Sequence, residues 1–312
     1  MVEILRLPYW VAGIAAALGL SLLVSDLYVA SVVNLVSIAA LIAVSLRFVM
    51  LIGELNFATA AFVGIGAYTT GSVITILDWP FGVAIILGGI SAAAVSVVFG
   101  YITLRTKGPY FLLIGFAFTE AVRIIYSKSM GLGGNSGMVG IFPPIALDPW
   151  MPTLVMAIAA LLIFALYAVE KSDFGKIFTA IRDNEDVART VGLNILFVKV
   201  TCFAIASFAA GVAGSLHAVV NNVISPGDFS FLLAAFALAY VKVGGEDNIV
   251  GPIVGTLLLV VLGSYALGLG GHEHIFYGAA IVLAVLLMPE GITGLLRKAF
   301  TRFTARGQRH AD

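Results

Sequence analysis

Two ionisable residues, Glu120 and Arg123, stand inside an apolar run of this 312-residue chain. They are three residues apart, so on a helix they share a face and can form an ion pair. If that run crosses a membrane, we expect the pair to line a solute pathway or to serve proton coupling. Two alternatives stand beside this interpretation: a structural ion pair, and an Arg123 that reaches the outer surface along its aliphatic stem.

Polar and aromatic residues form a second candidate site. Asn56 and Thr59 share a helical face, and Ser230 matches Asn56 in an internal repeat described below. We predict that these three polar side chains line a substrate pathway. Phe57 and Phe231 would offer apolar surface to the side chain of a solute. The competing interpretation is that the polar groups cap helices or bond between neighbouring helices.

The sequence lacks the motifs of an enzyme. It contains no Gly-x-x-x-x-Gly-Lys-Ser/Thr phosphate-binding loop, so we do not expect the chain to hydrolyse ATP by that route. It also lacks a catalytic triad. The segment 272–274, His-Glu-His, has no accompanying Cys or His cluster, and we interpret it as a solvated outer turn rather than a metal site. We predict a non-enzymatic chain with no metal or cofactor of its own.

The composition indicates a membrane protein. Hydrophobic residues make up 61% of the chain and charged residues 11%, and the mean hydropathy is +1.08. Soluble domains are nearer half apolar and a quarter charged, so we predict an all-α polytopic membrane protein with a single transmembrane domain over residues 1–312. The formal net charge is zero and no long basic run occurs, which argues against a nucleic-acid partner.

Ten apolar segments approach the roughly 20 residues that are needed to cross the hydrocarbon core. The segment 229–243 is short, and we expect it to be tilted, broken or re-entrant. Glycines in the third and seventh segments should let helices pack closely. The ten segments are 9–25, 29–46, 57–77, 81–104, 109–127, 150–169, 196–220, 229–243, 249–269 and 274–289, and the glycines are Gly64, Gly66, Gly211 and Gly214.

Lysine and arginine residues predict the orientation of these segments. With a cytoplasmic amino terminus, ten basic residues lie in the inner connections and five in the tail 290–312, which accounts for 15 of the 17. Only Lys128 lies in an outer loop. Both termini are then cytoplasmic, and the basic tail is expected to lie on anionic membrane lipid.

The segments 53–62 and 227–236 form an internal repeat. They align without gaps with five identical positions of ten, and Glu54 aligns with Asp228. The first copy leads into its span from the cytoplasm and the second from outside, so we predict an inverted five-plus-five repeat. In transporters built this way, the substrate site lies where the repeats meet.

The segment 170–194 is densely charged, although long apolar segments flank it on both sides. Its charges must lie in water, because a charge at the bilayer centre costs roughly 2.5–3.5 kcal/mol or more. Its apolar residues recur at three- and four-residue spacing, which predicts a short amphipathic helix that ends near Gly192. Such a helix suits docking into a partner's groove; a solvated connector helix is the competing interpretation. The apolar residues are Ile177, Ala180, Ile181, Val187, Ala188 and Val191.

The segment 170–194 also resembles the coupling loop of ABC importer permeases. Its core matches the Glu-Ala-Ala, three residues, Gly pattern, with Asp for Glu and Val for the first Ala. The run 174–194 is more similar to the LivM-type branched-chain amino acid permeases, whose Gly-Gly-Ser-Asn-Gly outer loop resembles the segment 131–137. The residues that the resemblance implicates are Arg182, Asp186, Val187, Ala188 and Gly192 in ATPase coupling, and Gly133, Gly134, Asn135 and Ser136 in the outer loop.

The resemblance implies a permease subunit of an ABC importer for branched-chain amino acids, in a bacterial or archaeal cytoplasmic (inner) membrane. It implies three kinds of partner: a homologous LivH-type permease, two ATPase subunits that bind the ATP and Mg, and an extracytoplasmic solute-binding protein. The ten-span arrangement also resembles the larger importers of the vitamin B12 type. Read without the family, the segment 131–137 is only a flexible outer loop.

Other functions stay open. Urea, short amides or other small carboxylates are alternative substrates within the family, because the binding protein sets much of the selectivity. An ion-coupled secondary transporter that uses Glu120 and Arg123 is an alternative of another class. A channel is disfavoured because no filter sequence stands out. An ATPase that copurifies with the chain would distinguish the importer from the other two classes.

Overall fold

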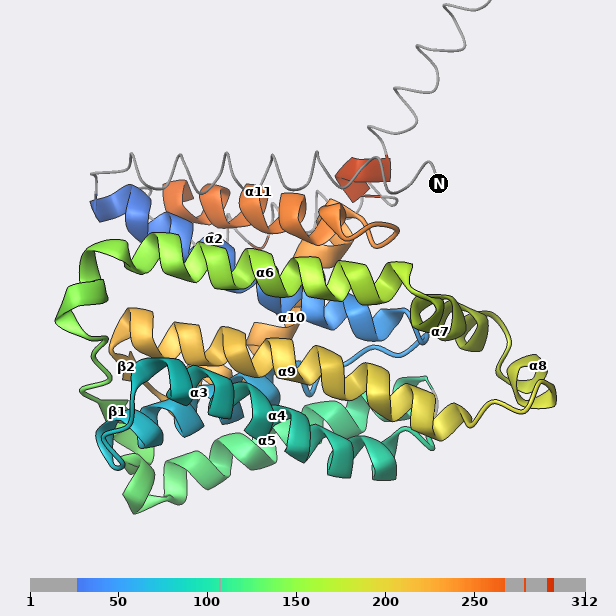
Figure 1. The fold of residues 1–312 in the computed structure, drawn as a ribbon, viewed down its shortest axis with the longest axis horizontal. Helices are drawn as coiled ribbons and strands as arrows, with labels where there is room; N and C mark the ends of the chain where they lie inside the picture. Colours follow the sequence, from blue (N-terminus) through green and yellow to red (C-terminus); the bar gives the residue numbers. More distant parts are fainter. Residues whose placement is uncertain (1–26, 107, 267–277, 279–290, 295–312) are drawn as a thin grey trace, which may run out of the picture.

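The computed structural model describes residues 27–106, 108–266, 278 and 291–294, and this part of the chain is mostly helical (Figure 1). A two-stranded antiparallel sheet pairs Met138 with Ile224 and Val139 with Val223. The elements in chain order are α2 (Leu27–Met50), α3 (Thr59–Thr75), α4 (Phe81–Thr103), α5 (Pro109–Lys128), η2 (Met130–Leu132), η3 (Gly134–Ser136), β1 (Met138–Val139), η4 (Ile145–Trp150), α6 (Met151–Lys171), α7 (Asp173–Asp183), α8 (Glu185–Thr190), α9 (Ile195–Asn221), β2 (Val223–Ile224), η5 (Pro226–Phe229), α10 (Phe231–Gly244) and α11 (Val250–Ala266).

Among the described residues, five helical stretches are long and apolar enough to cross a membrane. Two shorter apolar helices, Phe231–Gly244 and Val250–Ser264, accompany them. The prediction of an all-α polytopic membrane protein is therefore confirmed. The five stretches are Tyr28–Met50, Phe81–Thr103, Pro109–Lys128, Ile145–Lys171 and Ile195–Asn221.

The helical bundle has two distinct ends. Helices α7 and α8 lie at one end, and the strands β1 and β2 lie at the other (Figure 1). We call them the α7 end and the β end. The basic residues Arg47, Lys199 and Lys242, which the charge pattern predicts on one side of a membrane, all belong to contacts at the α7 end. The ends of α2, α9 and α10 that carry these residues therefore lie together, and the predicted orientation of the whole chain stays a prediction.

Glycines bring α3, α4 and α9 into close contact. A Cβ atom added at Gly66 would lie 2.0 Å from the carbonyl oxygen of Gly211, and one added at Gly214 would lie 1.9 Å from that of Val63. Even alanine would clash at these positions. The predicted role of these glycines in helix packing is confirmed, and it makes α3, α4 and α9 the tightly packed centre of the described fold.

The short span is confirmed as α10, which has 14 residues. At 1.5 Å per residue this helix is about 21 Å long, shorter than a hydrocarbon core of roughly 30 Å. The chain that precedes it is η5, where the Asp228 carboxylate accepts the backbone N–H of Ser225. Phe229 at the end of η5 is buried against Tyr68 of α3, with ring centroids 5.9 Å apart. The segment that leads into α10 is therefore anchored in the bundle by Phe229.

Several predictions lie outside the described residues. They concern the first span at 9–25, nearly all of the last span at 274–289, the turn at 272–274, and most of the tail 290–312. The ten-span count and the positions of the termini therefore stay predictions.

Candidate functional site

The predicted single helix in 170–194 is instead two helices, α7 and α8, which Asn184 separates. The Asn184 side chain accepts the backbone N–H groups of Asp186 and Val187, each at 3.1 Å. Asparagine is among the strongest N-cap residues, so it ends one helix by starting the next. The prediction of one continuous helix was wrong because the apolar spacing alone does not show this cap.

Helix α7 packs against the bundle through Ile181, which belongs to the predicted apolar face, and through Phe178, which does not. Phe178 is fully buried and meets Phe48 of α2 edge-to-face, with centroids 5.8 Å apart. Ile181 is also buried, whereas Ala180 is exposed. Helix α7 is therefore fixed to the bundle.

Helix α8 has an apolar surface that faces outward. Ala188 is buried, but Val187 and Val191 are 58% and 76% exposed, and Asp186 is exposed beside them. Gly192 has a φ of +84°, which favours glycine, and a Cβ added there would meet no atom within 4 Å. Three of the four predicted coupling residues of α8 and its end, Asp186, Val187 and Gly192, are therefore exposed, whereas Ala188 faces the interior.

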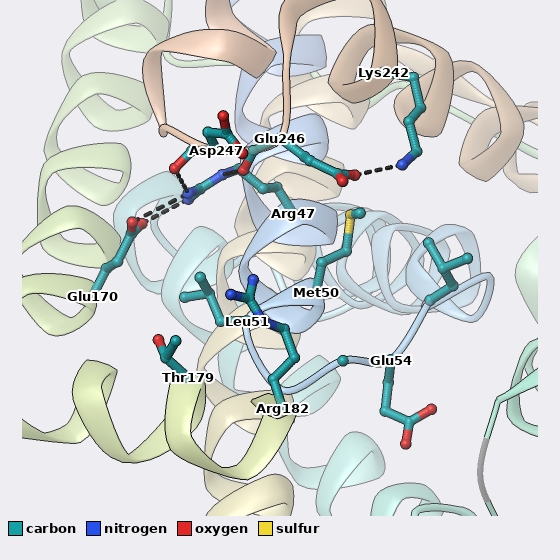
Figure 2. Close-up of a pocket in the computed structure, with 12 residues that line it drawn as sticks. Arg47, Met50, Leu51, Glu54, Glu170, Thr179, Arg182, Lys242, Glu246 and Asp247 are labelled. Carbon is teal, nitrogen blue, oxygen red and sulfur yellow. Dashed lines mark hydrogen bonds and ion pairs between the residues drawn. The ribbon is translucent and has the colours of Figure 1, made fainter. Parts of the chain in front are cut away.

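The fifth predicted coupling residue, Arg182, lies apart from the other four. Its side chain packs on the turn before α3, where a Cβ added at Gly53 would lie 3.2 Å from its Cγ. It also lines a cavity of about 460 Å³ at the α7 end (Figure 2). Arg182 therefore contributes to the contact between α7 and residues 51–58, the segment that leads into α3.

The same cavity is bordered by a buried arginine on α2. Arg47 binds Glu170 of α6 through two nitrogens, at 2.6 and 3.1 Å, and donates to the backbone oxygens of Glu246 and Asp247 after α10 (Figure 2). Its side chain is only 3% exposed. Because a bidentate pair fixes geometry as well as supplying energy, this network joins α2, α6 and the end of α10.

Lys199 forms an ion-pair cluster that the sequence interpretation did not find. Its ammonium lies 3.1 Å from Glu54 and 3.3 Å from Glu185, and its side chain is 4% exposed. Burial raises the pKa of Glu54 above its ordinary value, and the charge of Lys199 opposes that rise. The available signal was a lysine near the start of an apolar helix, since a buried lysine needs partners. The cluster joins α8, α9 and the segment that leads into α3.

Two of the predicted pathway residues, Phe57 and Phe231, are bound through their backbone by α5. The Thr119 hydroxyl donates to the Phe57 backbone oxygen at 3.0 Å, and the Phe231 backbone N–H donates to Glu120 at 3.4 Å. Adjacent residues of α5 therefore hold the leading segments of α3 and α10. Glu120 also pairs with Arg123 at 2.7 Å, so the predicted ion pair is confirmed.

The polar pathway candidates differ in their surroundings. Asn56 and Thr59 are both 2% exposed, and the Thr59 hydroxyl donates to the Asn56 backbone oxygen at 2.9 Å. Within the described residues, the side-chain oxygen of Asn56 is buried and accepts no hydrogen bond. Ser230 occupies the N-cap position of α10, but its side chain makes no cap hydrogen bond. Of these three residues, Asn56 is therefore the one with an unused hydrogen-bond acceptor, its side-chain oxygen.

The glycine-rich loop at the β end is ordered by the short helices η2 and η3. Gly133 and Gly134 have φ values of +79° and +58°, and Gly137 has +78°. A Cβ at Gly137 would lie 2.0 Å from the Ile224 backbone oxygen, so glycine lets this loop pack on β2. Asn135 and Ser136 are exposed. The loop thus contacts the chain that leads into α10.

No group of three or more His, Cys, Asp or Glu side chains in the described ranges is arranged to hold a metal ion. The site instead consists of contacts between helices. The two ion pairs of Lys199 join α8 to the segment that leads into α3.

Comparison with known proteins decides the family. Residues 28–288 match the family model described as "Branched-chain amino acid transport system / permease component". The chain belongs to this permease family. The match covers the helices from α2 to α11, so both the α8 surface and the α5 contacts lie within the matched region.

The known permeases with similar sequences include branched-chain amino acid permeases and ribose permeases. The high-affinity branched-chain amino acid transport system permease protein LivM of Escherichia coli is 26% identical over 275 residues, which cover 78% of this chain and 65% of that protein. The probable LivM of Methanocaldococcus jannaschii is 24% identical, over 67% of each chain. The ribose import permease protein RbsC of Bacillus subtilis is 27% identical over 81% of each.

Proposed function

We propose that the chain is the permease subunit of an ABC importer and that the α8 surface receives an ATPase subunit. The observation that carries this proposal is the outward-facing apolar patch of Val187 and Val191 beside the open Gly192. Exposed apolar side chains in a charged, solvated segment favour a docking surface over a solvated connector. Family membership supports the same role, with ATP and Mg held by the ATPase rather than by this chain.

The buried ion pairs offer a route by which ATPase movement reaches the pathway. Glu185 begins α8, and its partner Lys199 also holds Glu54, two residues before Asn56. A displacement of α8 would therefore pull on the segment that leads into α3. Arg182 at Gly53 provides a second contact from α7 to the same segment.

The solute would pass where the leading segments of α3 and α10 meet α5. The contacts of Thr119 with Phe57 and of Glu120 with Phe231 support an inverted repeat with its site at the junction. We propose Asn56, Thr59, Ser230, Phe57 and Phe231 as its lining, with Glu120 and Arg123 at its edge. The ten-helix arrangement of the vitamin B12 type completes this proposal.

Branched-chain amino acids are the proposed substrate, because LivM permeases of a bacterium and an archaeon are among the similar proteins. The proposed partners are a LivH-type permease, two ATPase subunits and an extracytoplasmic binding protein that the 133–136 loop would face. The α7 end and both termini would then be cytoplasmic. The RbsC similarity keeps a second substrate class open, and competition of unlabelled leucine or ribose with labelled leucine uptake would decide between them.

The docking proposal is tested by Gly192→Trp, with Gly192→Ala as the matched control. Both variants strain a backbone at positive φ, at a cost of roughly 1–2 kcal/mol, but only Trp adds bulk. We expect Trp to abolish ATPase copurification and uptake while insertion survives, and Ala to retain most of both. Copurification of an ATPase with the Trp variant at the wild-type level would refute the docking surface. Uptake that needs no ATPase would instead favour the ion-coupled transporter.

A further inference from the structure

Two adjoining cavities lie on the α4–α9 side of the bundle, near the α7 end. The first, of about 420 Å³, is an almost wholly apolar groove between α4 and α9. The second, of about 160 Å³, is polar and continues from the first, because Leu196 lines both. The residues of the groove that matter here are Val97, Tyr101, Leu196, Phe197, Val200 and Ala204.

The polar cavity carries two arginines from different elements. Arg105 follows α4 and Arg189 lies on α8. Neither guanidinium forms an ion pair within the described part of the chain. Glu185 also lines the cavity, but its carboxylate lies 3.3 Å from Lys199. The cavity therefore presents positive charge toward any ligand.

Tyr101 and Arg105 connect the two cavities. The Arg105 guanidinium lies over the Tyr101 ring, 4.9 Å from its centroid, and the same ring lines the apolar groove. A cation held on an aromatic face keeps its position while its charge stays available at the rim. Phe197 is 67% exposed and Tyr101 is 55% exposed along the groove, so its wall is open to the outside of the bundle.

We propose that this composite site binds one anionic phospholipid, whose phosphate lies between Arg105 and Arg189 and whose acyl chain lies in the α4–α9 groove. The arrangement matches this ligand because the apolar groove adjoins positive charge that has no ion-pair partner among the described residues, as the acyl chain of the lipid adjoins its phosphate. Anionic lipid is enriched in the cytoplasmic leaflet, so the site rests on the proposed cytoplasmic placement of the α7 end.

The site would make the docking helix sensitive to lipid. Arg189 lies on α8, three residues before Gly192, whereas Arg105 is anchored beside α4. A bound phosphate would therefore tie α8 to the membrane surface and limit its movement. We expect ATPase coupling to depend on anionic lipid through Arg189.

The test uses the full chain, purified with its copurifying subunits and reconstituted in phosphatidylcholine with or without phosphatidylglycerol. Native mass spectrometry then measures the lipid that the protein retains. We expect selective retention of phosphatidylglycerol, which Arg105→Gln and Arg189→Gln each lower about fivefold, the equivalent of about 1 kcal/mol per basic residue near an anionic surface. Ala204→Phe, which fills the groove, should also lower retention.

The controls separate the site from general surface charge. Lys171 lies over Tyr167 at 5.8 Å at the same end of the bundle, so Lys171→Gln removes a comparable cation–aromatic contact and should leave retention unchanged. Arg189→Lys keeps the charge and should restore most of the binding. A misfolded variant would instead lose binding with either replacement.

Three results would overturn the proposal. They are equal retention of the two lipids, wild-type retention in the double glutamine variant, or release of the lipid by inorganic phosphate alone. Loss of a copurifying permease from Ala204→Phe, with lipid retention intact, would show that the groove is a protein interface instead. None of these results affects the Gly192 experiment, so the docking proposal is tested independently of the lipid site.

Discussion

The segments 53–62 and 227–236 align in sequence but have different surroundings in the structure. In both, a carboxylate comes two residues before a polar residue, and a helix follows. Glu54 is 4% exposed and binds Lys199 of α9, whereas Asp228 is exposed and caps its own short helix at Ser225. The first copy is therefore tied to the rest of the bundle, and the second is stabilised locally.

The apolar side chains of the two copies show the same contrast. Ala58 and Phe62 in the first copy are fully buried, while the aligned Leu232 and Phe236 are 50% and 39% exposed. The first copy lies in the tightly packed centre near α8, and the second presents a surface. We infer that the first copy transmits movement from the α7 end and that the second faces lipid, solute or a second permease.

The largest expected effect comes from removing the Lys199 ion pair that holds the first copy, residues 53–62, to α9. Lys199→Met leaves the buried Glu54 and the partly exposed Glu185 without their shared cation, which should lower the free energy of unfolding by roughly 3–5 kcal/mol. The midpoint of thermal unfolding in detergent measures this loss. Adding Glu54→Gln to the same variant should recover part of it. An unchanged midpoint in the single variant would mean that Glu54 and Glu185 do not depend on Lys199.

An intermediate effect is expected at the aligned polar positions. Asn56→Leu removes a buried amide whose oxygen has no partner among the described residues, so assembly should survive while solute binding is weakened. At about 0.5–1.5 kcal/mol for each hydrogen bond, uptake should fall roughly two- to twelvefold. Uptake and binding-protein-stimulated ATPase activity are measured on the same reconstituted variant. Ser230→Ala is the matched change in the second copy and should have a smaller effect.

A parallel loss of uptake, ATPase activity and assembled complex in Asn56→Leu would contradict the pathway role. Asn56 would then be a packing residue.

The smallest effect is expected at the aligned carboxylate of the second copy. Asp228→Asn keeps an oxygen that can accept the Ser225 N–H, and the side chain is exposed, so stability should change by less than about 0.5 kcal/mol. Glu54→Gln, measured by the same thermal unfolding, should cost several times more. Equal losses would show that the two carboxylates play the same part, and the contrast between the copies would be wrong.

Much of this protein could be predicted from its sequence by itself. Apolar runs of about 20 residues predict membrane helices because the hydrocarbon core accepts no unpaired backbone groups. The basic residues predict which helix ends lie together, and Arg47, Lys199 and Lys242 do lie at one end. The pairing of Glu120 with Arg123 follows from spacing on one helix, which is a local property. The resemblance of the segment 174–194 indicates the family to which the chain belongs.

Only the tertiary structure decided which charges are buried together. Lys199 and Glu54 are 145 residues apart in the chain, and Arg47 and Glu170 are 123 apart, so no local spacing could pair them. The two leading segments meet at α5 for the same reason, since Thr119 and Glu120 are held by contacts across the bundle. The break between α7 and α8 depends on one side-chain cap at Asn184. Hydrophobic periodicity averages over several residues, whereas a cap or a buried ion pair depends on the position of individual atoms.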